Sequence, residues 1–166
     1  MTKRKRISTP FNGPVESGLR SLFILAAIHP ETCTLQELIY FDYLLVHSGD
    51  AGGPPSIHPP VPHRGGEWMV RRHFVQHGVA VCIARELVTK HFTTDGIKYG
   101  ASHLGCSIIR YFETEYAKEL ALRAAWIKAT MLPLGEQKLQ QFFLSGIGRW
   151  GTEFTREAAV RGNYSA

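Results

Sequence analysis

Histidine and cysteine side chains are the groups of this chain best suited to hold a metal ion. His73 and His77 are four residues apart, so on a helix both imidazoles would lie on one face. Cys82 and Cys106 follow, but there is neither a His-Glu-x-x-His arrangement nor a cysteine pair with zinc spacing. No cysteine, Cys33 included, is flanked by a motif that would activate it as a nucleophile. We therefore expect packed or surface histidines, buried cysteines and no metal site.

A second group that could do chemistry surrounds Asp50. Its carboxylate could form an acid–base cluster with His47, His58 and His63. A short carboxylate in a glycine-rich segment more often forms an Asx turn with its own backbone, which is the interpretation we favour. The nearby glycines are not followed by the Lys-Ser/Thr of a phosphate-binding loop. The sequence thus predicts no catalytic residue, no cofactor and no nucleotide site.

The segment that carries Asp50, residues 47–67, is unusually rich in proline and glycine. Prolines fix φ and remove backbone donors, and glycines allow positive φ, so we expect no helix or strand to run through it. Loops this long within compact domains are usually functional or disordered, and the prolines favour an ordered path. Ile57 and Val61 give the loop apolar side chains to bury. We interpret this segment as a rigid docking surface.

The bulk composition is that of an ordinary soluble globular protein. The 166 residues, 44% hydrophobic and 20% charged, suit one domain with an appended helical segment. Much of the net charge of +5 lies at residues 3–6. Three cysteines without a Cys-x-x-Cys pair favour a reducing compartment, for which the cytoplasm is the simplest assignment. The longest apolar run, around residues 22–28, is too short to span a bilayer, so we expect no membrane insertion and no export.

The spacing of apolar residues predicts three helices before residue 88. The first covers residues 14–28, and the second ends near residue 46. Thr34, followed three residues later by Glu37, is a capping box that opens the second helix. The third begins at Glu67, where a carboxylate favours the N-terminal end of the helix dipole.

Gly78 interrupts the third predicted helix. Glycine in a helix interior costs about 1 kcal/mol relative to alanine, so a kink or two shorter helices are open alternatives to the single helix that we favour. Residues 88–94 and 97–99 flank Asp95-Gly96, a dipeptide suited to a hairpin turn. Three helices and a hairpin are typical of a winged helix, with the third as recognition helix and the hairpin as wing.

Further helices are expected at residues 101–111 and 115–131, and Pro133 stops the second of them. The fold class is therefore mostly α, a winged-helix-like domain with additional C-terminal helices. The expected divisions are a basic flexible arm at 1–13, the winged-helix-like domain with its C-terminal helices at 14–131, and a helical or irregular tail at 132–166. A short helix in the tail carries Leu139, Phe142 and Phe143. Exposed Phe142, Phe143, Ile147 and Trp150 would be unusual for a bare tail, so they either fold back or meet a partner.

Basic residues gather where a winged helix would meet nucleic acid. Arg64, Arg71 and Arg72 lie at the start of the third helix, and Lys90 and Lys98 lie in the wing. This arrangement could bind the phosphates of double-stranded DNA. A solvated helix face explains the same residues equally well, and the sequence does not decide between the two.

Three stretches of the chain resemble the middle component of ABC three-component systems. They are Asp42-Tyr-Leu-Leu-Val-His-Ser-Gly-Asp-Ala-Gly-Gly-Pro-Pro-Ser-Ile-His-Pro-Pro60, Arg64-Gly-Gly-Glu67 and Thr94-Asp-Gly-Ile-Lys-Tyr99. The resemblance covers residues 11–130 and leaves out the basic arm and the tail. Its loop motif is far more specific than a helical pattern.

The resemblance implies a small non-catalytic subunit, encoded beside an SMC-like ABC ATPase and an effector that is often a nuclease. Such systems, Lamassu-type systems among them, act in bacterial defence against phages and plasmids. The middle subunit would bridge or regulate the other two. The positions that the resemblance assigns to partner contact are His47, Ser48, Gly49, Asp50, Gly52, Gly53, Pro54, Pro55, His58, Pro59, Arg64 and Glu67.

Two other functions fit parts of the sequence. A stand-alone winged-helix regulator that binds DNA would use the wing, the basic arm, Arg71 and Arg72. Such a regulator should bind a specific duplex alone, whereas an adaptor should bind DNA weakly until the ATPase is present. A hydrolase built on Asp50 and the loop histidines ranks below both.

Overall fold

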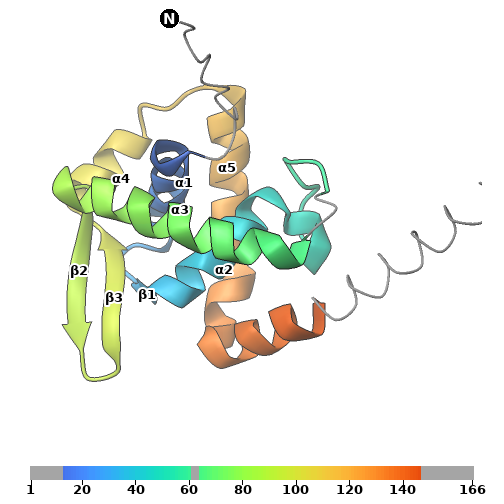
Figure 1. Ribbon diagram of the computed structural model, residues 1–166. Coiled ribbons are helices and arrows are strands. Elements are labelled where there is room, and N and C mark those ends of the chain that lie inside the picture. The colour runs from blue at the N-terminus through green and yellow to red at the C-terminus, as the bar shows by residue number, and fades with distance from the viewer. Residues whose placement is uncertain (1–12, 61–63, 147–166) are drawn as a thin grey trace, which may run out of the picture.

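The computed structural model describes residues 13–60 and 64–146 (Figure 1). Residues 1–12 of the predicted arm at 1–13, the loop residues Val61 and His63, and the tail beyond residue 146 lie outside the described residues. The elements, in chain order, are α1 (Pro14–Ile28), β1 (Cys33–Thr34), α2 (Leu35–Val46), a 3-10 turn η1 (Ser48–Ala51), α3 (Arg64–Ala84), β2 (Val88–Thr93), β3 (Gly96–Ala101), α4 (His103–Ile109), α5 (Glu115–Trp126), a π-helical turn (Ile127–Met131), a 3-10 turn (Leu132–Leu134) and a helix over residues 135–146.

The predicted mostly-α fold is confirmed. Three helices precede a hairpin, further helices follow it, and the order of the elements is compatible with a winged-helix-like domain. The three strands form one antiparallel sheet in the order β1-β3-β2. In Figure 1 the β2–β3 hairpin, the wing, extends away from the helices beside the C-terminal end of α3.

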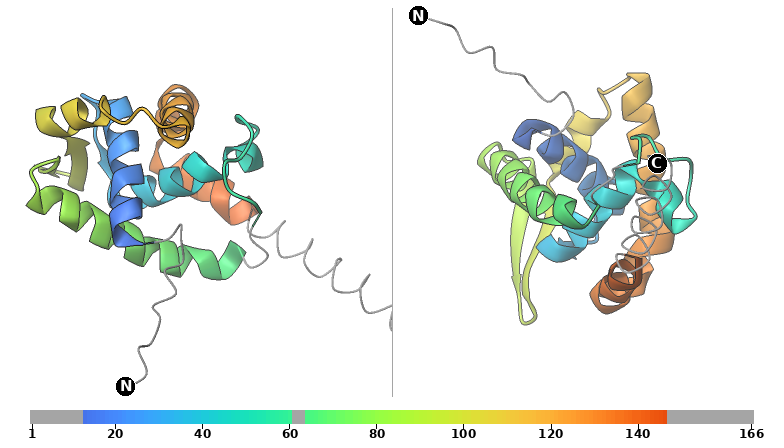
Figure 2. Two further views of the ribbon diagram at one scale, coloured as in Figure 1. Left: turned by 90° about the horizontal axis from the view of Figure 1, so that it is seen from above. Right: turned by 45° about the vertical axis from the view of Figure 1, so that its right-hand side comes forward.

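The core is built around α1 and α2. Helix α1 contacts α2, α3, α4 and α5, and Figure 2 shows it lying between α3 and α5. The capping box predicted for α2 is present: Thr34 Oγ1 accepts from the Glu37 amide at 3.1 Å, and Glu37 Oε2 accepts from the Thr34 amide at 2.8 Å. Within the described residues, no helix combines the length and apolar character needed to cross a membrane.

Gly78 is a point of contact between two helices. Helix α3 runs unbroken from Arg64 to Ala84, so the single-helix interpretation is correct, although the helix begins three residues before the predicted Glu67. A Cβ atom at Gly18 of α1 would lie 2.8 Å from the carbonyl oxygen of Gly78. The two backbones therefore touch, and only residues without a Cβ allow this approach.

The C-terminal helices differ from prediction in their ends. The helix expected over 101–111 covers His103–Ile109, because β3 extends to Ala101 and Ser102 caps the helix by accepting from the Gly105 amide at 2.9 Å. The helix expected over 115–131 is α-helical only to Trp126 and continues as a π-helical turn.

The short helix predicted in the tail is present over residues 135–146 and folds back on the core. Gly135, with φ of 77°, lets the chain turn between this helix and the preceding 3-10 turn. Leu139 and Phe143 are buried, and the Phe143 ring stacks on Tyr40 with centroids 4.5 Å apart.

Candidate partner-binding site

The loop after α2 begins with a turn of 3-10 helix over Ser48–Ala51, and α3 already includes Arg64–Glu67, so the loop is shorter than the expected 47–67. Over residues 52–60 no helix or strand is present, as predicted. The turn lies before the first proline of the segment, so every residue of the turn keeps a backbone N–H that can donate a hydrogen bond. The amide of Gly52 donates to the Gly49 carbonyl at 3.2 Å, and that of Gly53 to the Ser48 carbonyl at 3.0 Å. Gly52 adopts φ of 70° and ends the turn.

Two side-chain hydrogen bonds close the loop on itself. The hydroxyl of Ser48 donates to the Pro54 carbonyl at 2.8 Å, and the hydroxyl of Ser56 accepts from the Gly49 amide at 3.1 Å. Both bonds join the start of the loop to its middle. The conformation is thus fixed by polar contacts as well as by the prolines.

The second half of the loop returns to the end of α2. The carbonyl of Val46 accepts from the amides of Ile57 at 3.0 Å and His58 at 3.1 Å. Ile57 packs against the core, as its apolar side chain predicts. Together with the contacts above, these bonds tie the loop to the helix from which it emerges.

Helix α5 holds the outer part of the loop. Arg123, itself buried, donates from Nε at 3.1 Å and Nη2 at 2.6 Å to the carbonyl of Pro55, and its Nη1 pairs with Glu119 of the same helix. Gly53 lies flat on the indole of Trp126, since a Cβ at this position would be 2.5 Å from Cζ2 of the ring. Sequence reasoning missed both helix residues, because nothing local indicates what they contact.

His58 adds a third contact with α5. Its Nε2 is hydrogen-bonded to the Tyr116 hydroxyl at 3.1 Å, and the two rings are nearly parallel. Burial raises the pKa of Tyr116 above its usual value. The rings of Tyr43, His47, His58 and Tyr116 follow one another in a row, and His47 is buried between the rings of Tyr43 and His58. These histidines therefore support the shape of the loop.

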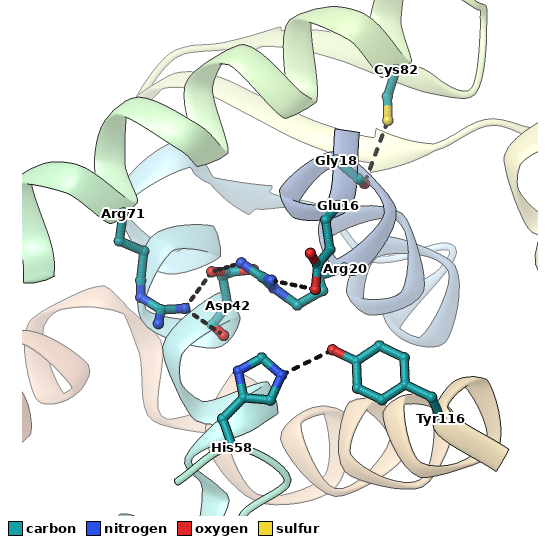
Figure 3. Close-up of polar contacts among 8 residues, drawn as sticks. All are labelled: Glu16, Gly18, Arg20, Asp42, His58, Arg71, Cys82 and Tyr116. Carbon is teal, nitrogen blue, oxygen red and sulfur yellow. Dashed lines mark hydrogen bonds and ion pairs between the residues drawn. The ribbon is translucent and has the colours of Figure 1, made fainter. Parts of the chain in front are cut away.

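A buried group of charges lies beneath the loop (Figure 3). Asp42 of α2 has no exposed surface; its Oδ1 accepts from Arg20 Nε at 2.8 Å and its Oδ2 from Arg71 Nη1 at 2.6 Å. Glu16 completes the group with a 3.4 Å ion pair to Arg20. The buried Asp42 carboxylate is thus paired with two guanidinium groups, and Arg20 also reaches the partly exposed Glu16.

The pKa of Asp42 follows from this arrangement. Burial alone would raise it, but Arg20 and then Arg71 outweigh burial and hold the pKa of Asp42 below its ordinary value. For Glu16 the balance is the opposite, because burial raises its pKa more than Arg20 lowers it. The Asp42 carboxylate is therefore held ionised as a link between α1, α2 and α3.

Asp50 is connected to this charged group through Tyr43. The guanidinium carbon of Arg71 lies 5.3 Å from the centre of the Tyr43 ring, and the Tyr43 hydroxyl donates to Asp50 Oδ2 at 2.5 Å. We expected the Asp50 carboxylate to accept from its own backbone in an Asx turn. The structure adds a side-chain partner for it, the Tyr43 hydroxyl of α2. Through this hydrogen bond Asp50 ties the start of the loop to α2.

The candidate metal ligands do not converge within the described residues. His73 and His77 have ring centroids 4.3 Å apart on the exposed side of α3, yet in that part of the chain no three histidine, cysteine or acidic side chains are placed to hold an ion. All three cysteines are free thiols. Burial raises the pKa of Cys33 and of Cys82, which keeps both thiols protonated.

The basic residues predicted to contact nucleic acid separate into two groups. Arg72, Lys90 and Lys98 have surface positions on α3 and the wing, and Arg72 donates to the side chain of Gln36 at 3.2 Å. Arg71 is buried instead, with its guanidinium on Asp42, so it has a structural role that its position beside Arg72 did not reveal. Arg64 lies in the first turn of α3, and its side chain is outside what the structure describes.

The predicted partner residues are brought together in part. Positions 47–59 form one continuous segment in which the predicted residues Gly49, Asp50, Gly52, Pro55 and Pro59 are exposed and Gly53, Pro54 and His58 are half-buried. The buried members, His47 and Ser48, hold the loop in place. Glu67 lies in the N-terminal part of α3, and its side chain, like that of Arg64, is not described.

Comparison with known proteins places the chain in a family. The model of the family described as ABC-three component (ABC-3C) system Middle Component 2 matches residues 10–153. No curated protein and no solved structure matches the chain. The matched range extends past the expected 11–130 and includes the helix over residues 135–146, which agrees with the packing of that helix on the core. The chain therefore belongs to the middle component 2 family of ABC three-component systems.

Proposed function

We propose that this middle component is a non-catalytic subunit that bridges or regulates an SMC-like ABC ATPase and a nuclease effector in bacterial defence against phages and plasmids. Lamassu-type systems are an example of such an assembly. The single observation that carries the proposal is the fixed shape of the loop over residues 48–60, held by hydrogen bonds within the loop, to Val46 and to α5. The free thiols are in keeping with assembly in the cytoplasm.

A rigid loop is a suitable contact for a large partner. Ordering a flexible segment on binding costs free energy, and a segment already ordered in the free subunit avoids that cost. The exposed Pro55, Pro59 and Pro60 offer apolar surface to a partner. Arg64 and Glu67 at the start of α3 extend the proposed contact surface.

We assign the ATPase to the loop and double-stranded DNA to the other end of the molecule. Arg72, Lys90 and Lys98 are the proposed phosphate contacts. Arg64, the remaining candidate for DNA contact, lies at the opposite end of α3 beside the loop, so we assign it to the ATPase surface. Arg71 is left out because its charge is paired with Asp42. Phosphate contacts of this kind bind without sequence preference, as a subunit of a larger DNA-associated assembly requires.

The second candidate function is a stand-alone DNA-binding regulator. It is favoured by the order of the elements and by the exposed polar face of α3. A regulator should bind one duplex sequence with high preference in the absence of any other protein. The proposed subunit should instead bind DNA weakly and without sequence preference until the ATPase is present.

Co-purification with the ABC ATPase encoded beside the chain tests the proposal. Deleting the loop is a poor variant, because Gly53, Pro55 and His58 pack on α5 and their loss would disturb that helix. Substituting the exposed Pro59 and Pro60 by glutamate leaves these contacts intact. We expect the Pro59→Glu/Pro60→Glu variant to fold and to lose the ATPase, and the matched control Thr93→Glu/Thr94→Glu, on the wing, to retain it. Full retention by the loop variant contradicts the proposal.

A further inference from the structure

The tip of the wing exposes two apolar side chains that face the same way. Phe92 is 80% exposed and Ile97 is 41% exposed, and the two are cross-strand partners in the β2–β3 pair. They stand one pair before the turn at residues 94–95, and Figure 1 shows that the turn end of the hairpin extends away from the helices. A large aromatic side chain at the end of a projecting hairpin adds nothing to the core, so its surface is available to a ligand.

Lysines lie on both faces of this hairpin. Because side chains alternate along a strand, Lys90 and Tyr99 share the face of Phe92 and Ile97, whereas Lys98 points to the opposite face with its partner His91. The only carboxylate of the hairpin, Asp95, lies in the turn. The apolar tip is therefore flanked by positive charge on either side.

Among the side chains of α3 that the structure describes, residues 70–84, none carries a negative charge. Of these, the exposed polar residues are Arg72, His73, Gln76 and His77, and Arg85 follows the helix. The sequence has no aspartate or glutamate between Glu67 and Glu86. A polyanion lying along α3 and the wing would meet mostly cations and hydrogen-bond donors; the exposed carboxylates on this path are Glu86, between α3 and β2, and Asp95, in the turn.

We propose that Phe92 is a wedge that enters the minor groove of duplex DNA and separates two stacked base pairs, with Ile97 packed behind it. Lys90 and Lys98 then contact phosphates on the two sides of the groove. Apolar side chains of architectural DNA-binding proteins act in this way and kink the duplex. The inference deepens the DNA contact proposed above and names the residues that deform the duplex; it does not depend on the loop or on the ATPase.

The test uses the full chain and a short duplex rich in TA steps, which unstack most easily, labelled with 2-aminopurine. Unstacking raises the fluorescence of 2-aminopurine. We expect wild-type protein to raise it, and Phe92→Ala to abolish the rise and weaken binding about tenfold, within the range found for aromatic stacking on bases. The slope of log affinity against log salt should stay unchanged, because no phosphate contact is lost.

Two further variants make the test specific. Lys90→Ala combined with Lys98→Ala should lower the salt slope by about two units, one for each lost phosphate contact. Leu122→Ala, which trims an exposed apolar side chain on α5, is the matched control and should leave affinity and fluorescence unchanged.

The same measurements can overturn the inference. Absence of a fluorescence rise with wild-type protein, or unchanged affinity of Phe92→Ala, rules out the wedge. Loss of the ATPase from the Phe92→Ala variant with DNA binding intact would show that the tip contacts a protein instead. Because Phe92 lies outside the core, its substitution should not alter the melting temperature, and loss of binding cannot then be attributed to unfolding.

Discussion

Arg123 of α5 donates two hydrogen bonds to the backbone carbonyl of Pro55, 68 residues earlier in the chain. A guanidinium and a carbonyl oxygen in a largely buried position form a strong, directional contact. Since Pro55 stands at the outer bend of the loop, the orientation of the proposed docking surface depends on a helix that is distant in sequence.

Loss of this contact should loosen the loop. We predict that Arg123→Ala lowers the free energy of unfolding by about 1–3 kcal/mol, the usual cost of removing a charge-assisted hydrogen bond. Hydrogen exchange across residues 48–58 should become faster, because the bonds from Ile57 and His58 to Val46 then open more often. Lys128→Ala, which removes an exposed cation from the adjoining π-helical turn, is the control. Equal exchange in the two variants would show that Arg123 does not hold the loop.

The contact between Gly53 and Trp126 predicts a second-site rescue. A Cβ at Gly53 would overlap the indole, so Gly53→Ala should destabilise the protein and speed exchange in the loop. Replacing Trp126 by alanine removes the overlap. In urea unfolding, the double variant should therefore lose less free energy of unfolding than the two single variants lose together, by about 0.5 kcal/mol or more. Additive losses would mean that the two positions do not interact.

Asp42 predicts a dependence of stability on acid. Its pKa in the folded state is below the ordinary value of 3.8, so folding is favoured while the carboxylate is ionised. The contribution of Asp42 to the free energy of unfolding is complete above pH 3.8. It shrinks as the pH falls below 3.8, because the unfolded chain binds a proton at Asp42 first. It is lost as the pH passes through the pKa of Asp42 in the folded state. Glu16, whose pKa is raised by burial, acts in the opposite sense.

Asp42→Asn isolates the Asp42 contribution. It leaves Arg20 and Arg71 buried without their carboxylate partner, so we expect a loss of about 3–5 kcal/mol near neutral pH. The difference between wild type and variant should narrow as the pH falls below 3.8. Asp95→Asn, in the exposed turn of the wing, is the control and should follow the wild-type curve. A difference that is constant with pH would contradict the assigned pKa direction.

Features set by local sequence could be predicted. The capping box of Thr34 and Glu37 and the Asp95-Gly96 hairpin turn both depend on residues a few positions apart, and both are present. The stiffness expected of the loop from its prolines is consistent with its hydrogen-bonded path.

Features set by tertiary contacts could not be predicted. The single helix favoured through Gly78 is confirmed, but the reason for a glycine there, the close crossing with Gly18 of α1, is invisible in the sequence. Arg71 was grouped with Arg72, yet adjacent residues on a helix point in different directions, and only Arg71 reaches Asp42. One usable signal was overlooked: Asp42 is a single carboxylate inside the apolar run of α2, and such a charge requires a buried partner.

The most direct test of the proposed docking role places a photoreactive benzoylphenylalanine at position 59 and irradiates the assembled complex. Pro59 is exposed at the outer side of the loop, so the substitution does not disturb its packing. We predict a covalent adduct with the ABC ATPase from position 59, and none from a control probe at Leu122 on α5. An intact complex in which position 59 gives no adduct with any other subunit would contradict the central claim that this loop is where the ATPase binds.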